Sequence, residues 1–461
     1  MTVRVKGLAA GRSMSLFNNH SDLTPVAADG VITFPTRLDG GAPYTVSVAV
    51  QPVGQRCDVH EGTGIAGRDP NAVVSITCQS RRQFAVARDR VFKQIRTYVT
   101  DPESGLITPV RYTRLSTGAY PHRILLLPNG TTGYVLSMDR FGADVVNPTF
   151  GERQLMKFSL DPATGALSKQ PTERLGSDHA PTDMAISPSG DRLHVIGNDR
   201  DDMTRDYVDD RIRLSPQGHE EYFDSWKFSR PSKVDPSPRC VQMRNRPNAG
   251  GELRDFPDDL RVAPNDRFAY AIDCAPGPGR ELAVVAFEVA SPSGHLVRID
   301  LNDTELGRLH ANRLALNPQG TYLYVSDAER SMLHAFRVDD STGQLHALAG
   351  ASVATPPRPG QVVVSHDGRF VYVVHRQDKQ ISAWRVDAET GLLTPIPGSP
   401  YTAGRIPLGM TIDASQTHIY LPYEDQTAIG VVKMDAETGA LQFQASVNTE
   451  QASSEEIVMT P

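Results

Sequence analysis

The sequence lacks several features that would place it in a common class of protein. It has no run of about 18 apolar residues, the length that spans a bilayer as a helix. It has no excess of basic residues, because its formal net charge is -7, so no electrostatic footprint for nucleic acid is present. It also has no long helical period, whereas Gly and Pro number 37 and 34. We therefore expect neither a transmembrane segment nor a nucleic-acid partner, and a fold of strands and turns.

Motifs for the common catalytic and cofactor chemistries are missing as well. No Ser-His-Asp order, Gly-rich phosphate loop, Cys/His metal spacing or haem Cys-x-x-Cys-His motif occurs. The acidic run at 198–202 is interrupted by Arg200 and lacks the spacing of an EF-hand, so a solvated loop is the better interpretation. The sequence therefore predicts no cofactor and no metal.

A secretory signal is absent from the chain as given, because residues 1–6 contain no apolar segment. A removed leader and a start assigned downstream of a leader would both produce this pattern. The cysteines bear on the choice, since Cys57 and Cys78 lie at the ends of alternating runs, as a cross-strand disulfide requires. Such a bridge would stabilise the fold by about 3 kcal/mol, and two buried free thiols are the alternative. We expect an extracytoplasmic protein, whether periplasmic, secreted or surface-anchored.

Residues 1–80 differ in texture from the rest and predict a small β-sandwich of immunoglobulin-like size. Half-buried strands are expected at 32–35, 44–50 and 73–78, separated by Gly and Asp turns. The runs Tyr-Thr-Val at 44–46 and Gln-Pro-x-Gly-Gln-x-Cys at 51–57 resemble a module found at the front of many exported bacterial envelope proteins. This resemblance implies export and implies no chemistry.

A repeat of roughly 45 residues builds the remainder of the chain, and residues 358–400 show it most clearly. The unit contains two apolar runs around a His-Asp-Gly turn, an alternating strand and an Asp-x-x-Thr-Gly corner, which predicts a small antiparallel sheet. Its first marker, a Pro seven residues before the first turn, recurs along the chain. The Pro occurs at Pro121, Pro181, Pro257, Pro359 and Pro407, and Ala311 and Ser454 take its place in the two other units.

The second marker is the corner Asp-x-x-Ser/Thr-Gly-x-Leu/Ile. In this corner the Asp accepts backbone hydrogen bonds and the Gly supplies a positive φ, so we assign it a structural role. Its Asp is found at Asp101, Asp161, Asp339, Asp387 and Asp435.

Seven first strands predict an all-β fold, a seven-bladed β-propeller over residues 81–461 preceded by the sandwich. The last strand, 454–461, has no partners after it, so its blade must be completed by strands from 83–111. Residues 199–255 are expected to hold blade strands interrupted by an excursion. Whether Cys240 and Cys274 pair across this excursion is left open.

Loops that enter the first strands and follow the second strands meet at one mouth of a propeller channel, where function is usually placed. We predict that His122, His179 or Asp183 activates water and that Arg123 or Arg313 stabilises an oxyanion. The alternative is that these groups pair off in salt bridges and serve only the structure. Ligand binding is predicted for a second set of mouth residues, namely Arg358, His375, Arg376, Arg405 and Glu424.

The repeat from 83 to 461, with Tyr-Leu-Tyr-Val at 322–325 and Asp-Asp-Ser-Thr-Gly at 339–343, resembles the lactonase family of seven-bladed propellers. That family includes 6-phosphogluconolactonases and carboxymuconate-cyclising enzymes. The phosphogluconolactonase branch carries Gly-Pro-Arg-His before a first strand and Asn-Glu after the second. Here those places hold the residues of 310–313, where Asn312 and Arg313 replace Arg-His, and Ala328 replaces the Glu.

The leading hypothesis is an exported lactonase-like propeller that binds a polar, small acidic or sugar-derived ligand in its channel. If this propeller is catalytic, it hydrolyses or forms a lactone. The competing hypothesis is a non-catalytic envelope propeller that binds a protein or a glycan. Three or more unpaired ionisable groups around one small cavity would favour the enzyme, whereas paired charges would favour the scaffold.

Overall fold

A computed structural model describes most of the chain. The described residues are 2–67, 74–89, 92–117, 120–138, 153–170, 179–188, 190–199, 206–214, 220–229, 258–274, 282–291, 294–301, 309–425, 427–449 and 454–461. Within these ranges the protein consists of strands and turns and contains no helix. Over the same ranges no helix is long and apolar enough to cross a membrane.

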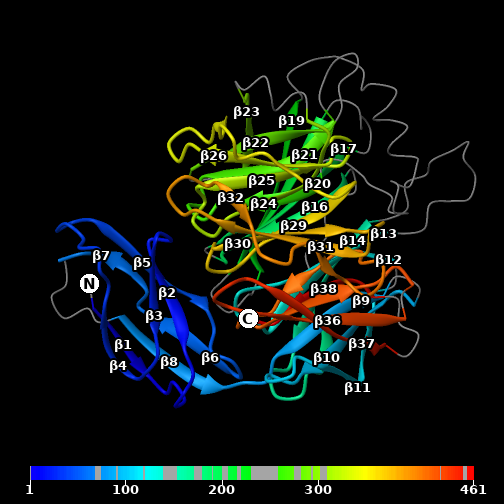
Figure 1. The fold of residues 1–461 in the computed structure, drawn as a ribbon. Coiled ribbons are helices and arrows are strands. Elements are labelled where there is room, and N and C mark those ends of the chain that lie inside the picture. The colour runs from blue at the N-terminus through cyan, green and yellow to red at the C-terminus, as the bar shows by residue number, and fades with distance from the viewer. Residues whose placement is uncertain are drawn as a thin grey trace, which may run out of the picture.

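The N-terminal module consists of two four-stranded sheets that share one core (Figure 1). Side chains from both sheets, such as Val5, Leu16, Val46 and Ile76, are buried in a single apolar cluster. Together the two sheets therefore form a sandwich. The first sheet has the order β4 (Gly30–Thr33), β1 (Thr2–Lys6), β8 (Val74–Ser80) and β6 (Gln55–His60). The second has the order β3 (Asp22–Val26), β2 (Met14–Asn18), β5 (Pro43–Val50) and β7 (Thr63–Ile65).

The predicted disulfide between Cys57 and Cys78 is present. The two cysteines are direct cross-strand partners on β6 and β8, and both are buried in the core of the sandwich. The bridge therefore joins the strand that carries Arg56 to the strand that leads into the propeller.

Seven antiparallel sheets follow, which confirms the predicted seven-bladed β-propeller. Blade 2 consists of β12 (Tyr120–Leu126), β13 (Thr132–Met138), β14 (Arg153–Leu160) and β15 (Leu167–Gln170). Blade 3 consists of β16 (His179–Ile186), β17 (Arg192–Asp199), β18 (Asp206–Leu214) and β19 (Glu220–Ser229). Blade 4 consists of β20 (Asp258–Val262), β21 (Phe268–Cys274), β22 (Leu282–Val289) and β23 (Leu296–Ile299).

Blades 5, 6 and 7 follow the same order from the inner to the outer strand. Blade 5 consists of β24 (Ala311–Leu316), β25 (Tyr322–Asp327), β26 (Met332–Val338) and β27 (Leu345–Ala347), with β28 (Val353–Ala354) beside β26. Blade 6 consists of β29 (Pro359–Val364), β30 (Phe370–His375), β31 (Gln380–Val386) and β32 (Leu393–Pro395), with β33 (Tyr401–Thr402) beside β31. Blade 7 consists of β34 (Thr411–Ile412), β35 (His418–Pro422), β36 (Ala428–Met434) and β37 (Leu441–Asn448).

Blade 1 joins the two ends of the propeller. Its inner strand is β38 (Ser454–Met459), which pairs with β9 (Phe84–Asp89), and β10 (Gln94–Thr100) and β11 (Ile107–Ser116) complete the sheet. Two hydrogen bonds between Phe84 and Thr460 extend the pairing beyond β38. Closure of the ring is therefore non-covalent.

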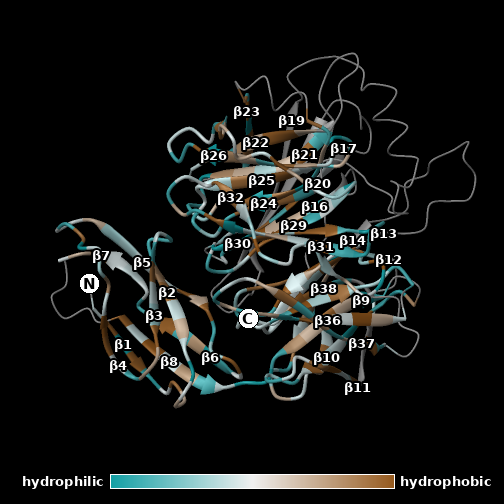
Figure 2. Cartoon of the chain, in the orientation of Figure 1, coloured by the Kyte–Doolittle hydropathy of each residue, from teal (hydrophilic) through white to brown (hydrophobic). Residues whose placement is uncertain are grey.

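Neighbouring blades pack through their second strands, because each of these strands is covered on both faces. Every residue of the second strands β9, β25 and β30 is buried. The third strand β31 exposes one side chain, Arg385. Figure 2 shows the same distribution, with brown strands inside the propeller and teal residues in the turns.

The corner glycines serve this packing. A Cβ on Gly343, which has a φ of +70°, would lie 2.5 Å from the ring of Phe268 on the preceding blade. The hydroxyl of Tyr270 donates to the carbonyl of Gly343 at 3.0 Å, and Tyr372 and Tyr420 do the same for Gly439 and Gly105. The corner therefore needs glycine both for its backbone conformation and for room beside an aromatic ring.

Part of the stretch 199–255 forms blade strands. Strands β18 and β19 lie within it and complete blade 3, while residues 230–257 lie outside the described part of the chain. Cys240 and the side chain of Cys274 lie outside the described part as well.

Candidate functional site

Polar side chains lie two residues after the marker positions in every blade except blade 7, where this residue is Gly409. In several blades this side chain accepts a hydrogen bond from a backbone N–H of the next blade. Glu456 accepts from Ile124 at 3.1 Å, Asp183 from Leu260 at 2.8 Å, Asp259 from Leu314 at 2.6 Å and Gln361 from Met410 at 2.7 Å. We call this set of four bonds the inner latch ring. It connects blades 1 to 2, 3 to 4, 4 to 5 and 6 to 7.

Arg123 and Asp183, both predicted to be catalytic, are brought together within this ring. Arg123 Nε donates to Asp183 Oδ1 at 2.9 Å, which links blade 2 to blade 3. Asp183 also accepts from the N–H of Met184, and it is only 3% exposed. The structure thus places this carboxylate in an inter-blade network, as the alternative interpretation of the mouth charges expects.

The other predicted catalytic residues lie elsewhere on the first strands. His122 is half-buried on β12, and Arg313 is half-buried on β24, where its N–H donates to Ser326. His179 begins β16, but its side chain lies outside the described part. Neither His122 nor Arg313 lines the pocket described below, so their catalytic roles remain predictions.

Blade 5 carries a compact group of ionisable residues at the mouth. His310 Nδ1 lies 3.2 Å from Glu329 Oε2, and its backbone N–H donates to the buried Asp327. Asp327 also accepts from Arg330 Nη1 and from two backbone N–H groups of its own turn. Burial alone would raise the pKa of Asp327, but these hydrogen bonds, together with the His334 ring 3.7 Å away, lower it well below its ordinary value. Asp327 is therefore an ionised anchor for the turn.

Two predicted ligand-binding residues of blade 6 have opposite surroundings. Arg358 is exposed and holds a φ of +53° between two prolines. His375 is 0% exposed, and neither ring nitrogen has a hydrogen-bond partner in the structure as described. Burial lowers the pKa of His375 to about 4, so the ring is neutral near pH 7. His375 therefore cannot bind a ligand directly in this conformation.

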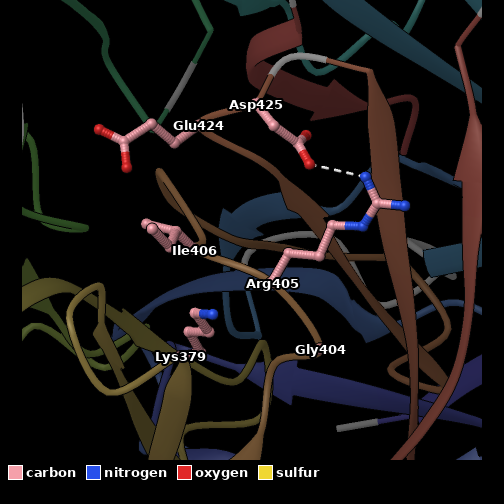
Figure 3. A pocket seen from close by; sticks show the side chains of 6 residues that line it. All are labelled: Lys379, Gly404, Arg405, Ile406, Glu424 and Asp425. Carbon is pink, nitrogen blue, oxygen red and sulfur yellow. Dashed lines mark hydrogen bonds and ion pairs between the residues drawn. The ribbon is translucent and has the colours of Figure 1, made fainter.

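A pocket of about 350 Å³ lies at the mouth between blades 6 and 7 (Figure 3). It is lined by residues from three loops, the turn between β30 and β31, the segment before β34 and the turn after β35. These residues are Lys379, Gly404, Arg405, Ile406, Glu424 and Asp425. Two predicted ligand-binding residues, Arg405 and Glu424, thus come together.

Backbone contacts hold the loops of the pocket in place. Lys379 C=O accepts from the N–H of Ala403, and Ile406 C=O accepts from the N–H of Glu424. Gly404 has a φ of +78°, and a Cβ there would lie 2.6 Å from the ring of Phe443. The pocket floor is therefore built on fixed backbone, with glycine at the point of closest packing.

The charges of the pocket are paired, with one exception among its lining residues. Arg405 Nη1 contacts Asp425 Oδ2 at 2.6 Å, and Glu424 contacts Arg376 at 3.2 Å (Figure 3 shows the first pair). Partial burial raises the pKa of Asp425, but hydrogen bonds from Arg405 and Thr427 outweigh it and hold the pKa below its ordinary value. Lys379 is exposed and pairs with none of the described carboxylates. The lining pairs together with Lys379 therefore leave one net positive charge.

Two charged lining residues, Lys379 and Asp425, were not predicted to bind ligand. Both follow a second strand at the mouth, the same topological position that pointed to Arg376 and Glu424. That position was the available signal, but it could not show which side chain of a short turn faces a neighbouring blade. Within the described residues, no group of three or more His, Cys, Asp or Glu could hold a metal ion.

Comparisons with known proteins support the fold. A family described as "Lactonase, 7-bladed beta-propeller" matches residues 349–455, which are blades 6 and 7 and the start of β38. The pocket lies within this matched segment. No curated protein matches the sequence.

Solved structures match over most of the chain at low identity. The periplasmic gluconolactonase of Pseudomonas aeruginosa has 17% identity and a TM-score of 0.60, with 83% of this chain and 99% of that chain covered. A protein of Bacteroides uniformis, named only provisionally as a 6-phosphogluconolactonase, has 16% identity and a TM-score of 0.59 and covers 83% and 100%. A Lactobacillus plantarum protein has 15% identity and a TM-score of 0.58 and covers 83% and 100%. At these identities the likeness concerns the fold.

Proposed function

We propose that this protein is an extracytoplasmic, lactonase-like propeller that binds a small, polar, acidic molecule in the pocket between blades 6 and 7. The observation that carries the proposal is the composition of that pocket. Lys379, a cation that pairs with none of the described carboxylates, stands beside Arg405 and two carboxylates. A volume of about 350 Å³ is at the lower end of small-molecule sites, which suits a ligand of the size of a sugar.

The chemistry of the lining indicates a hydroxylated carboxylic acid. The Lys379 ammonium can bind a carboxylate through a charge-assisted hydrogen bond. The side chains of Glu424 and Asp425 are 44% and 45% exposed, so their carboxylate oxygens can accept hydrogen bonds from ligand hydroxyls. A sugar-derived acid offers both kinds of group.

The reaction we propose at this pocket is the hydrolysis of a lactone or its reverse. Water attacks the lactone carbonyl and passes a proton to a carboxylate such as Glu424. The bond between the carbonyl carbon and the ring oxygen then breaks, and the ring oxygen takes up a proton as the hydroxy acid forms. Lys379 or Arg405 would stabilise the oxyanion that forms on the carbonyl oxygen.

The extracytoplasmic location has two supports. The Cys57–Cys78 disulfide is of a kind that persists in oxidising compartments. A structural neighbour of similar fold is a periplasmic protein by name.

The experiment is a panel of sugar lactones, with acid release followed by pH-stat against the spontaneous rate. We expect acceleration by the purified protein and a roughly 10- to 100-fold loss of kcat/KM in Lys379→Ala, because a charge-assisted contact contributes about 1.5–3 kcal/mol. Lys169→Ala, which changes an exposed lysine on β15, is the matched control and should retain full activity. Equal activity in both variants would remove Lys379 from the site.

A second candidate function is a non-catalytic envelope propeller that binds a protein or a glycan. The pairing of the mouth charges favours it, since Arg123, Arg376 and Arg405 each contact a carboxylate. If no lactone is turned over and gluconate does not raise the melting temperature, a glycan array probed with the same protein becomes the deciding measurement. Binding on that array would then favour this second function.

A further inference from the structure

The N-terminal sandwich contacts the propeller at the place where the ring closes. Its contacts reach three consecutive blades. The N–H of Gln51 donates to the carbonyl of Ala414 in blade 7 at 2.9 Å. Arg12 pairs with Glu103 at the corner of blade 1. Arg56 reaches the first turn of blade 2.

Arg56 is the centre of this contact. Its Nη1 and Nη2 donate to the carbonyls of Asn129 and Pro128 at 3.0 and 2.9 Å, while its Nε donates to Asp58 at 2.7 Å. The Asp58 contact orients the guanidinium, so both remaining donors face blade 2. Gly130 lies between Arg56 and Pro461, because a Cβ there would be 2.7 Å from Arg56 Nη1 and 2.9 Å from Pro461 Cδ. The contact therefore includes the residue that follows the closing strand.

The inner latch ring has no bond at this junction, as it has none between blades 2 and 3 and between blades 5 and 6 among the described residues. The position that would form the bond from blade 7 to blade 1 is Gly409, which has no side chain. A Cβ there would lie 2.5 Å from Gln361 Oε1, the group that forms the preceding bond to Met410, so a side chain at this position would displace Gln361. The glycine thus leaves room for the 6-to-7 bond.

We propose that the sandwich is a clamp that holds the propeller closed across blades 7, 1 and 2. The contacts of the sandwich connect blades 7 and 1 from outside the ring, at the junction where Gly409 has no side chain to form an inner bond. The disulfide belongs to the clamp, because Cys57 follows Arg56 on β6 and Cys78 lies on β8, only a few residues before β9 of blade 1. Both strands that bear on the closure are therefore fixed to each other.

The test is hydrogen–deuterium exchange on the full chain with both arginines removed. In Arg12→Ala/Arg56→Ala we expect amides of β38 and β9 to exchange at least about tenfold faster, because opening of this blade becomes easier. Amides of β25 in blade 5, on the far side of the ring, should be unchanged. Arg4→Ala, an exposed arginine of β1 in the same module, is the matched control and should leave β38 at the wild-type rate.

A second variant distinguishes a clamp from a local contact. Cys57→Ala/Cys78→Ala should also speed exchange in β38 and β9, although it removes no contact to the propeller. The proposal is overturned if the double arginine variant changes exchange only in β6 and the 128–130 turn, or if β38 and β25 lose protection equally. If the cysteine variant does not fold, mild reduction of the wild-type chain before labelling gives the same comparison.

Discussion

The inner latch ring and the pocket between blades 6 and 7 contain the same kinds of charged residue, but these residues differ in their burial and in their partners. In the ring, Asp183 is 3% exposed and accepts two backbone hydrogen bonds besides its bond from Arg123. In the pocket, the side chain of Asp425 is 45% exposed and contacts another half-exposed side chain. A charged residue at the mouth is thus committed to the fold when it is buried against the next blade's backbone. It stays available to a ligand when it lies on a loop.

Removal of the Asp183 carboxylate is the strongest test of this difference. Asp183→Ala should lower the free energy of unfolding by about 3–5 kcal/mol, because it leaves Arg123 and two N–H groups without their buried partner. Asp378→Ala, an exposed aspartate in the mouth turn of blade 6, should change it by less than about 0.5 kcal/mol. Urea denaturation of both variants gives the measurement, and equal effects would contradict the assignment of Asp183 to the fold.

The pH dependence of stability tests whether burial sets the pKa of His375, a residue that the sequence predicts at the mouth. The unfolded chain binds this proton near pH 6.5 and the folded chain near pH 4, so the unfolded state binds more protons in between. Stability should therefore be full above about pH 6.5 and fall by up to about 3 kcal/mol as the pH is lowered to about 4.

His375→Gln should lose most of this slope, and His346→Gln, which changes an exposed histidine on β27, should keep it. Thermal melts between pH 4 and 7 provide the comparison. A wild-type slope in His375→Gln would mean that other groups account for the acid sensitivity.

A smaller effect is expected where the ring omits a side chain. Gly409→Ala places a Cβ 2.5 Å from Gln361 Oε1 and should break the bond from Met410, at a cost of about 1–2 kcal/mol. Gly40→Ala, which meets nothing within 4 Å, should change the free energy of unfolding by less than about 0.5 kcal/mol. If the two glycine variants unfold at the same urea concentration, the bond from Gln361 contributes nothing measurable.

The fold could be predicted because each blade repeats its own markers in the sequence. The Pro position and the Asp-x-x-Ser/Thr-Gly corner are local signals, and the orphan strand at 454–461 required a partner from the start of the propeller. The site could be predicted less well, because its chemistry depends on contacts between blades. Residue type and strand position predicted Asp183 and His375 as mouth residues. They could not show that the N–H of Leu260 donates to Asp183, or that His375 is fully buried.

The smallest effect is expected at the pocket pair, and a double-mutant cycle measures it directly. Arg405→Ala, Asp425→Ala and their combination should give a coupling energy of about 0.2–1 kcal/mol, because both side chains are nearly half exposed. The coupling should shrink further in 0.5 M NaCl, where exposed charges are screened. The same cycle on Arg123 and Asp183 should give a larger value that salt changes little, since burial excludes the screening ions. If the two cycles gave the same coupling and the same salt dependence, burial would not be what separates the charges of the ring from those of the pocket.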